Sequence, residues 1–349
     1  MAGHDIIVIG SSAGGYRTLT RLMEELPADL PAAIFVVQHL TPDRDTRLAS
    51  LLQKNTQLTV ETARDGGDIA RGTVYVAPPD HHLLVHGGRI RTVRGPRENL
   101  HRPAVDVLFR SAAWEFGTRV IGVVLTGNLD DGSAGLSAIK TCGGLTVVQD
   151  PADALFPSMP AHALAATEVD HCVPLARMPQ LLSRLARQPA PARDGYPVPN
   201  RIKLETQFAM LERDMSAMDE IGKPSELACP SCHGTLCEVD GENRFRCHTG
   251  HAFSLQSLAH AQPEAVEEAL FQAVRALQET ISVAKRVALG GWEPERKARQ
   301  EQKIAEMTEA ADTLRALLVG AAGMGIDASQ PTDASPSGGM PSDFADDAR

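Results

Sequence analysis

A short turn near the amino terminus carries a serine that could act as a nucleophile. Residues 10–14 read GSSAG, a G-x-S-x-G pattern that follows the apolar run Ile6–Ile9 and precedes a helical pattern. In a nucleophile elbow, small residues on both sides of the serine allow a sharp turn that presents the hydroxyl. Backbone N–H groups at the start of the following helix can then stabilise an oxyanion. Ser12 is therefore a candidate nucleophile, although small-residue turns also serve tight packing of a helix on a strand.

A phosphate-binding turn is the alternative for the same stretch. A dinucleotide fingerprint needs G-x-G-x-x-G after the first strand, but Ser12 stands where the second glycine would let the backbone approach the pyrophosphate. A phosphate loop of the Walker type would end in Gly-Lys-Ser/Thr, which the turn does not contain. The turn by itself therefore favours a nucleophile or a packing role over a nucleotide.

A base and an orienting acid for Ser12 follow two other apolar runs. AIFVVQH ends in His39, and VIGVVLTGNLDDG contains Asp130 and Asp131. Functional groups gather beyond the carboxyl ends of strands in doubly wound sheets, so we expect these side chains to meet at one sheet edge. Each also has a structural alternative. His39 could be an ordinary polar residue at a strand end, and Asp131 could be the N-cap of a helix over Ser133–Thr141.

Short β-rich runs alternate with amphipathic segments through the first half of the chain. Nearly continuous apolar runs are typical of strands that helices cover on both faces. We predict strands at Ile6–Ile9, Ala33–Gln38, Thr73–Ala77, His82–Val85, Val120–Thr126 and Leu145–Gln149. We predict helices at Tyr16–Leu26, Asp45–Lys54, Ala104–Phe116, Ser133–Thr141 and Met178–Arg187. The alternation predicts an α/β fold with a doubly wound, mostly parallel sheet in a Rossmann-like three-layer arrangement.

Several stretches, in their order along the chain, resemble the catalytic domain of the chemotaxis receptor methylesterases, the CheB-type protein-glutamate methylesterases. They are IGSSAGG, VVQHL, APPDHHLL, HRPAVDVLFRSAA, VLTGNLDDGSAGL and QDPADALFPSMPAHAL, and they cover roughly residues 4–185. The order Ser12, His39, Asp131 also differs from the serine, aspartate, histidine order of α/β-hydrolases. The sequence therefore favours this family over a generic esterase.

The resemblance implies a catalytic triad of Ser12 as nucleophile, His39 as general base and acid, and Asp131 as the residue that orients the imidazole. It implies backbone N–H groups of Ala13 and Asn128 as the oxyanion site. The implied reaction is hydrolysis of γ-glutamyl methyl esters on methylated chemoreceptor-like proteins, with glutamine deamidation as a second activity. No cofactor is implied for catalysis.

The sequence departs from the family pattern in the loop that precedes the triad aspartate. The family reads Leu-Thr-Gly-Met-Gly-x-Asp-Gly, whereas Asn128-Leu129 stands here in place of Met-Gly. Leucine adopts a positive φ less readily than glycine, so this substitution bears on the shape of the oxyanion site. Arg102, in HRPAVD, could face the active site and position a carboxyl-bearing substrate, or it could be a helix-start or surface arginine. Family members in chemotaxis usually carry an amino-terminal receiver domain. With the first strand expected near residue 5, we predict a stand-alone form.

A crowded set of cysteines and histidines follows a proline-rich linker. Cys229-x2-Cys232 and Cys247-x3-His251 are spaced as two pairs of ligands for a tetrahedral zinc site with no open position. LCEV and RFRC between them predict two strands of a small zinc-ribbon-like module, joined at Asp240-Gly241. So short a segment has little core, and a metal would add stability. Reduced, unliganded cysteines are the alternative, and other ligands could substitute within the set: Cys237, His233 and His248.

Apolar residues spaced by three and four predict a helical hairpin after the cysteines, broken at Gly290-Gly291. We expect it to serve packing, partner docking or self-association rather than catalysis. The expected organisation is a catalytic domain over 1–187, a linker and partly helical connector over 188–228, the zinc-ribbon-like module over 229–255, the hairpin over 262–319 and a disordered tail over 320–349.

The bulk composition excludes several functional classes. The 349 residues carry a net charge of −10, which gives no general affinity for nucleic acid or anionic membranes. No signal peptide or membrane-spanning run is recognisable, so we expect a cytoplasmic protein without membrane insertion. Two further functional classes stay open beside the methylesterase. One is a catalytically weak signalling scaffold that acts through the zinc and helical module, and the other is a small-molecule carboxylesterase.

Overall fold

The expected parallel sheet is present, and it has seven strands. The computed structural model describes residues 3–39, 47–212, 215–239, 241, 243–288 and 293–320. The strands are β1 (Ile6–Ser11), β2 (Ala33–Gln38), β3 (Thr59–Thr62), β4 (Thr73–Val76), β7 (Val120–Val124), β8 (Leu145–Gln149) and β9 (His171–Val173). They lie in the order β3-β4-β2-β1-β7-β8-β9, and every neighbouring pair is parallel. Because β1 is central, the chain leaves it first toward β2 and later toward β7. That reversal creates the crevice where doubly wound folds bind ligands.

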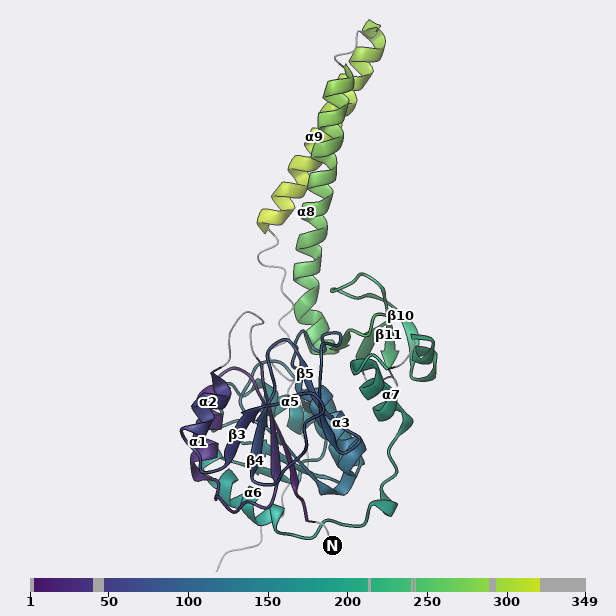
Figure 1. Ribbon diagram of the computed structural model, residues 1–349. Helices are drawn as coiled ribbons and strands as arrows, with labels where there is room; N and C mark the ends of the chain where they lie inside the picture. Colours follow the sequence, from purple (N-terminus) through teal and green to yellow (C-terminus); the bar gives the residue numbers. More distant parts are fainter. Residues whose placement is uncertain are drawn as a thin grey trace, which may run out of the picture.

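Helices cover both faces of this sheet (Figure 1). α1 (Gly15–Glu25), α2 (Leu48–Gln53) and α6 (Met178–Ala186) supply apolar side chains to one core. α3 (Val105–Phe116), α4 (Ser133–Thr141) and α5 (Ser158–Ala166) supply them to the core on the opposite face. Strands between two such layers must be apolar on both sides, which is why β1 and β2 are buried along their whole length. The predicted three-layer α/β fold is confirmed.

One expected strand does not belong to the parallel sheet. β5 (His82–His86) pairs with β6 (Arg89–Val93) in a separate antiparallel hairpin. Gly87 and Gly88 between them both have positive φ, at 61° and 70°, as a tight two-residue hairpin turn requires. In the first half of the chain, four short elements were not expected: β3, β6, β9 and α5. The expected start of α2 at Asp45 lies outside the described residues.

The carboxyl-terminal half adds a second sheet and two long helices. After α7 (Asn200–Ala209), β10 (Gly222–Ala228), β11 (Thr235–Val239), β12 (Arg244–Cys247) and β13 (Ala252–Ser254) form an antiparallel sheet. This sheet begins at Gly222, inside the segment expected to be a connector. α8 (Leu255–Ala288) and α9 (Pro294–Gly320) pack as a hairpin that extends away from both sheets (Figure 1). Short 3₁₀ turns occupy Gly117–Arg119, Leu175–Arg177, Arg193–Gly195 and Met215–Glu220.

Two buried carboxylates, two buried guanidinium groups and the half-buried guanidinium of Arg244 join the two halves of the chain. Glu98 accepts from Arg110 of α3 at 2.6 Å and from Arg246 of β12 at 2.8 Å. Glu205 of α7 accepts from Arg246 at 3.2 Å and also from Arg244. A buried charge is stable only when it is paired, so each half supplies the partners that the other half needs. We call these five residues the buried charge cluster.

The expected break at Gly290-Gly291 and most of the expected tail lie outside the described residues. Within the part of the chain that the structure describes, every helix is too short or too polar to cross a membrane.

Acidification should weaken the buried charge cluster. Burial acts to raise the pKa of Glu98 and Glu205, but the neighbouring arginines outweigh it and hold both pKa values below the usual range. Carboxylates with a lowered folded-state pKa stabilise the fold above their unfolded pKa of about 4.3, and that contribution is lost as pH falls below it. We expect Glu205→Gln to lower the free energy of unfolding by about 3–5 kcal/mol at pH 7.

Urea unfolding at pH 7 and pH 3 measures this difference, and the gap between variant and wild type should narrow at pH 3. Glu226→Gln, at an exposed position on β10, is the matched control and should behave like the wild type. An equal effect of Glu205→Gln at both pH values would contradict the assignment.

Candidate active site

The serine turn is fixed by a glutamine on the neighbouring strand. β1 ends at Ser11, whose hydroxyl donates to Oε1 of Gln38 at 2.8 Å. Nε2 of Gln38 donates to the carbonyl of Ser12 at 2.7 Å. Ser11 is fully buried by this contact, whereas Ser12 is half-buried. The two adjacent serines therefore differ in exposure: the hydroxyl of Ser11 is buried in a hydrogen bond, whereas Ser12 is partly accessible.

Close packing around this turn requires glycine at two positions. A Cβ atom on Gly10 would lie 2.2 Å from Cγ1 of Val105, and one on Gly15 would lie 1.9 Å from Oε1 of Gln38. Neither distance leaves room for a side chain. Gly10 and Gly15, two of the small residues around Ser12, thus let α3 and Gln38 approach the end of β1.

His39 lies beside Ser12 because of strand register. β1 and β2 are parallel with Ser11 opposite Gln38, so the next residues along, Ser12 and His39, emerge from adjacent strand ends. The backbone N–H of His39 donates to the carbonyl of Ser11 at 3.0 Å. Neighbouring strands are about 4.8 Å apart, which brings the two side chains within reach of each other.

The carboxylate of Asp131 holds the imidazole. Nε2 of His39 donates to Oδ2 of Asp131 at 2.7 Å, and both side chains are almost fully buried. Nδ1 of His39 is buried too, and it has no hydrogen-bond partner among the described residues. Nδ1 is therefore the ring nitrogen that is available to Ser12. The other aspartate of the pair, Asp130, instead accepts from the hydroxyl of Ser254 at 2.8 Å.

Asp131 does not cap the helix that follows it. Its carboxylate accepts from the backbone N–H groups of Val105 at 2.6 Å and Asp106 at 3.1 Å, at the start of α3. In turn, Asp106 of α3 accepts from Gly132 at 3.0 Å and Gly135 at 2.6 Å, at the start of α4. The two aspartates therefore cap each other's helices, and the structural alternative of Asp131 as the N-cap of Ser133–Thr141 is wrong. A carboxylate at a helix N-terminus is stabilised by the helix dipole.

The carboxyl groups of Asp131 and Asp106 have pKa values shifted in opposite directions. Burial acts to raise the pKa of Asp131, but its hydrogen bond with His39, the charge of His39 and the hydrogen bond from Asn99 bring it below the usual range. Burial and the nearby Asp131 charge raise the pKa of Asp106 to about 7. Asp131 is therefore the carboxylate that stays ionised beside the histidine.

A second histidine lies flat against His39. The rings of His39 and His101 stack with centroids 3.6 Å apart and planes 16° from parallel. Burial, and next the charge of His39, lower the pKa of His101 to about 3, so His101 is neutral. A neutral ring on one face excludes water and restricts rotation of the His39 imidazole.

The expected oxyanion donors lie at the edge of the turn. Among the described residues, the backbone N–H groups of Ala13 and Asn128 donate no hydrogen bond, so both could serve a ligand. Leu129 adopts φ = 60°, the left-handed conformation of glycine at this position in the family pattern. The loop therefore keeps its backbone shape despite the substitution, at a cost of about 1–3 kcal/mol that the surrounding packing must offset.

Arg102 and His82 both have contacts away from the triad. Arg102 donates to the carboxylate of Asp80 at 2.6 Å and to the carbonyl of Gly95 at 2.7 Å. His82 is fully buried between the carbonyl of Pro96 and the N–H of Ala104. Both therefore hold the loop before α3, and the expected role of Arg102 in positioning substrate stays a prediction.

The sequence reasoning missed Gln38, Asn99 and Asp106 as parts of the site. Nδ2 of Asn99 donates to Oδ1 of Asp131 at 3.0 Å and to Oδ2 of Asp106 at 2.9 Å. Asp106 lies in the matching stretch HRPAVD and Gln38 in VVQHL, so the motifs contained both residues. Their roles depend on contacts between segments that are distant in sequence.

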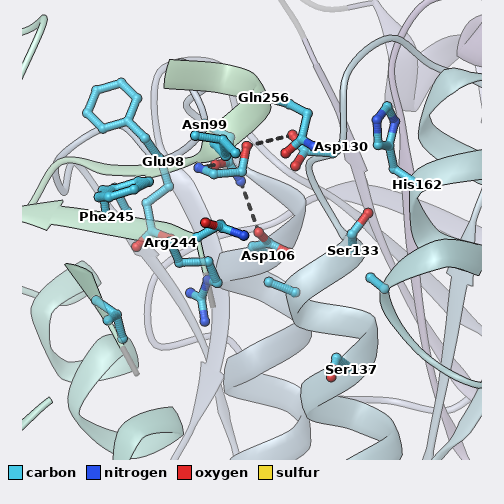
Figure 2. A pocket seen from close by; sticks show the side chains of 18 of the residues that line it. Glu98, Asn99, Asp106, Asp130, Ser133, Ser137, His162, Arg244, Phe245 and Gln256 are labelled. Atoms are coloured by element: carbon cyan, nitrogen blue, oxygen red, sulfur yellow. Dashed lines mark hydrogen bonds between the residues drawn. The ribbon is translucent and has the colours of Figure 1, made fainter. Parts of the chain in front are cut away.

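A cavity of about 500 Å³ lies next to this carboxylate pair, between α4, α5 and the second sheet. Its lining includes Asn99, Asp106, Asp130 and His162, which Figure 2 shows around the start of α4. Ser12 and His39 do not line it. The cavity is therefore separate from Ser12, and we place the chemistry at Ser12 because His39, at the adjacent strand end, is held by the carboxylate of Asp131.

The predicted metal ligands converge in the second sheet. The ligand atoms of Cys229, Cys232, Cys247 and His251 all lie within 4.8 Å of one another. Sγ of Cys232 and Cys247 are 3.5 Å apart, and Nδ1 of His251 is 3.6 Å from Sγ of Cys247. Tetrahedral zinc with Zn–S bonds of ~2.3 Å needs S···S edges of about 3.8 Å, so the set could hold such an ion. The alternative ligands Cys237, His233 and His248 are not part of the cluster.

Comparison with known proteins points to one family. The model of the CheB methylesterase family matches residues 7–182. A protein from Leptospira interrogans is 39% identical over 183 residues, which are 52% of this chain and 95% of that protein. A Methanosarcina mazei protein named protein-glutamate methylesterase/protein-glutamine glutaminase 2 is 35% identical over 191 residues, 52% of each chain. This chain thus spans about half the length of the latter relative.

A solved structure agrees with the sequence matches. The crystal structure of the Thermotoga maritima CheB methylesterase catalytic domain has a TM-score of 0.50 and 35% sequence identity. The match covers 53% of this chain and all of that chain. The second sheet and the helical hairpin follow the segment that the family model matches.

Packing against the nucleophile predicts the effect of one added methyl group. A Cβ atom on Gly127 would lie 2.8 Å from Cβ of Ser12 and 2.1 Å from Sδ of Met159. Met159 is flexible, but Ser12 is held at a strand end, so we expect Gly127→Ala to displace the serine. Overpacking of this kind costs about 1–3 kcal/mol.

Urea unfolding should show that loss, and the rate at which a fluorophosphonate probe labels Ser12 should fall at least tenfold, roughly 1.4 kcal/mol in activation free energy. Gly195→Ala is the matched control, because a Cβ atom there would meet nothing within 4 Å. Unchanged stability and labelling of Gly127→Ala would contradict the prediction, because the serine turn would then accommodate the added methyl group.

Proposed function

The chain belongs to the CheB methylesterase family, and from this premise we propose that it hydrolyses γ-glutamyl methyl esters on methylated chemoreceptor-like proteins, yielding glutamate and methanol. The observation that carries the proposal is the hydrogen-bonded pair of His39 and Asp131 at the strand end beside Ser12. The names of relatives also include a glutaminase activity. Deamidation of glutamine side chains is the second reaction that we propose for the same site.

The proposed reaction follows the roles of the three side chains. Nδ1 of His39 takes the hydroxyl proton of Ser12 as the oxygen attacks the ester carbonyl. The tetrahedral oxyanion accepts hydrogen bonds from the backbone N–H groups of Ala13 and Asn128. The C–O bond to methanol breaks, and His39 returns the proton to the departing methoxide. Water then attacks the acyl-enzyme with His39 again as base, which releases the glutamate carboxyl group and restores Ser12.

Asp131 stabilises the imidazolium that forms in each step. It stays ionised because its four hydrogen-bond donors favour the charged form, and its bond to Nε2 keeps Nδ1 directed at Ser12. Usual triads present Nε2 to the serine, so the proposal assigns the opposite ring nitrogen to proton transfer. The hydrogen-bonded pair of His39 and Asp131 beside Ser12 supports an enzyme over a catalytically weak scaffold.

Replacing the nucleophile tests the proposal directly. We expect Ser12→Ala to lower methanol release from methylated receptor membranes by at least about a thousandfold, because no attacking oxygen remains. Ser11→Ala is the matched control. It loses the hydrogen bond to Oε1 of Gln38 but keeps the one from Nε2 of Gln38 to the carbonyl of Ser12, so it should retain release. Gas chromatography of released methanol measures both.

Equal release by Ser12→Ala and wild type would reject Ser12 as nucleophile. Rapid turnover of simple esters with no release from methylated receptor would instead favour a small-molecule carboxylesterase.

We propose that Cys229, Cys232, Cys247 and His251 bind one structural zinc ion. When bound, zinc would cross-link the β10–β11 turn to the β12–β13 turn and stabilise the sheet, with no open position for catalysis. The donor set supports this assignment, because three thiolates and an imidazole suit zinc.

Metal analysis tests this site. Protein purified without a histidine tag should contain about one zinc per chain, and Cys229→Ala or Cys247→Ala should lower that content. Cys237→Ala is the control, since Cys237 lies outside the ligand cluster and should leave the content unchanged. Protein without zinc, or loss of zinc only in Cys237→Ala, would refute the assignment.

The remaining proposals concern setting and organisation. We propose a cytoplasmic location, where thiolate ligands stay reduced, and a catalytic domain over residues 1–187 that is followed by the metal module and the helical hairpin. Self-association through the hairpin is also a proposal. Exposed apolar residues of both its helices support it: Val266, Phe271, Val283, Val287, Leu317 and Val319.

A further inference from the structure

One side chain connects the second sheet to the triad aspartate. The amide nitrogen of Asn99 donates one proton to Asp131 and one to Asp106. Its amide oxygen accepts from the backbone N–H of Ser254 at 3.0 Å and from the hydroxyl of Ser257 at 3.3 Å. Carboxylates only accept and the Ser254 N–H only donates, so the amide has one orientation that satisfies both sides.

The loop that carries Asn99 also pairs with β13 through its backbone. Asn99 donates to the carbonyl of Ala252 at 2.8 Å, and Ala252 donates to the carbonyl of Arg97 at 3.2 Å. Asn99 has a positive φ of 48°, a conformation that these contacts must hold in place. The second sheet thereby fixes both the backbone and the side chain of Asn99.

The residues that make these contacts flank two of the proposed metal ligands. Arg246, which pairs with Glu98, immediately precedes Cys247, and Ala252 immediately follows His251. The backbone N–H of Cys247 donates to the carbonyl of His251 at 3.0 Å, so the ligand loop aligns β12 with β13. An ion that holds Cys247 and His251 together would order both strands.

The apolar support of β13 is small. A second apolar cluster packs α7 against β11 and includes no residue of β12 or β13. The cluster beside the ligands consists of six fully or nearly buried residues, two of which are ligands themselves: Cys229, Leu236, Phe245, Cys247, Phe253 and Leu258. So small a core contributes little stability, and metal binding free energy commonly replaces it in modules of this size. Order in β13 is therefore expected to depend on the ion.

We propose that the metal module positions the triad: metal-ordered β13 fixes Asn99, and Asn99 fixes the carboxylate of Asp131 that orients His39. Asn99 is a positioning residue, since it contacts Asp131 and not the reacting atoms. The inference rests on the proposed function, and it makes ester hydrolysis dependent on an ion that takes no part in the reaction. Figure 2 shows Asn99 facing Asp106 at the cavity between the two halves.

Hydrogen exchange of the full-length protein tests the structural part without any substrate. Chelation of the metal should speed exchange of backbone amides over residues 97–106, which include the donors to Asp131. Amides of β7 (Val120–Val124), in the centre of the parallel sheet, should stay protected. If chelation, or purification without any metal, leaves 97–106 as protected as in metal-loaded protein, the proposal is overturned.

Labelling of Ser12 by a fluorophosphonate tests the catalytic part. We expect Asn99→Gly, which tolerates the positive φ, to slow labelling about tenfold while metal content is unchanged. Chelation should slow the wild type by a similar factor and should slow Asn99→Gly little further, because the contact that it acts through is already gone. Additive effects of chelation and Asn99→Gly would overturn the coupling.

Two serine variants distinguish loss of the contact with Asn99 from a general loss of stability in the second sheet. Ser257→Ala removes a hydrogen bond to Asn99 and should slow labelling, whereas Ser225→Ala removes one to Leu236 and should not. Equal effects of the two variants would contradict the assigned route. Failure of the proposed function has a different signature: wild type that labels rapidly but releases no methanol from methylated receptor leaves the positioning tests valid.

Discussion

The buried carboxylate of Asp131 is the interaction on which the rest of the site depends. It accepts four hydrogen bonds, from His39, Asn99 and two N–H groups at the start of α3. A buried charge with fewer partners would cost several kcal/mol or would take up a proton. The geometry of the strand ends, the helix start and the Asn99 loop is therefore set by one requirement, which is to keep this group ionised.

The same requirement explains why α3 and α4 are so closely joined. Each helix begins at an aspartate supplied by the other, so neither helix start is satisfied alone. Gly10 and Gly135 remove the side chains that would separate the helices from β1 and from each other, since a Cβ atom at Gly135 would lie 2.5 Å from Phe109. The active site is thus a consequence of how the helices are capped and packed on the sheet.

The second sheet extends this network into a part of the chain that the family model does not match. Its two arginines complete the buried charge cluster with Glu98 and Glu205, and its β13 contacts the next residue, Asn99. Glu98 binds Arg246 of the second sheet, and the next residue, Asn99, binds Asp131. Because the two residues are adjacent, a shift of one displaces the other. Docking of the second sheet and orientation of the Asp131 carboxylate therefore depend on one loop.

Local patterns in the sequence were sufficient for the parallel sheet, for Ser12 and His39 at adjacent strand ends and for four clustered metal ligands, because each depends on strand periodicity or on short spacing. The tertiary structure decided what local patterns do not contain. It placed β5 in a separate hairpin and gave Asp131 the start of α3 instead of α4. It also left Nδ1 of His39 without a partner among the described residues and joined Asn99 to Ser254, 155 residues later. The physical reason is that a buried polar group binds whatever partner the folded chain brings nearest, and sequence distance does not limit that choice.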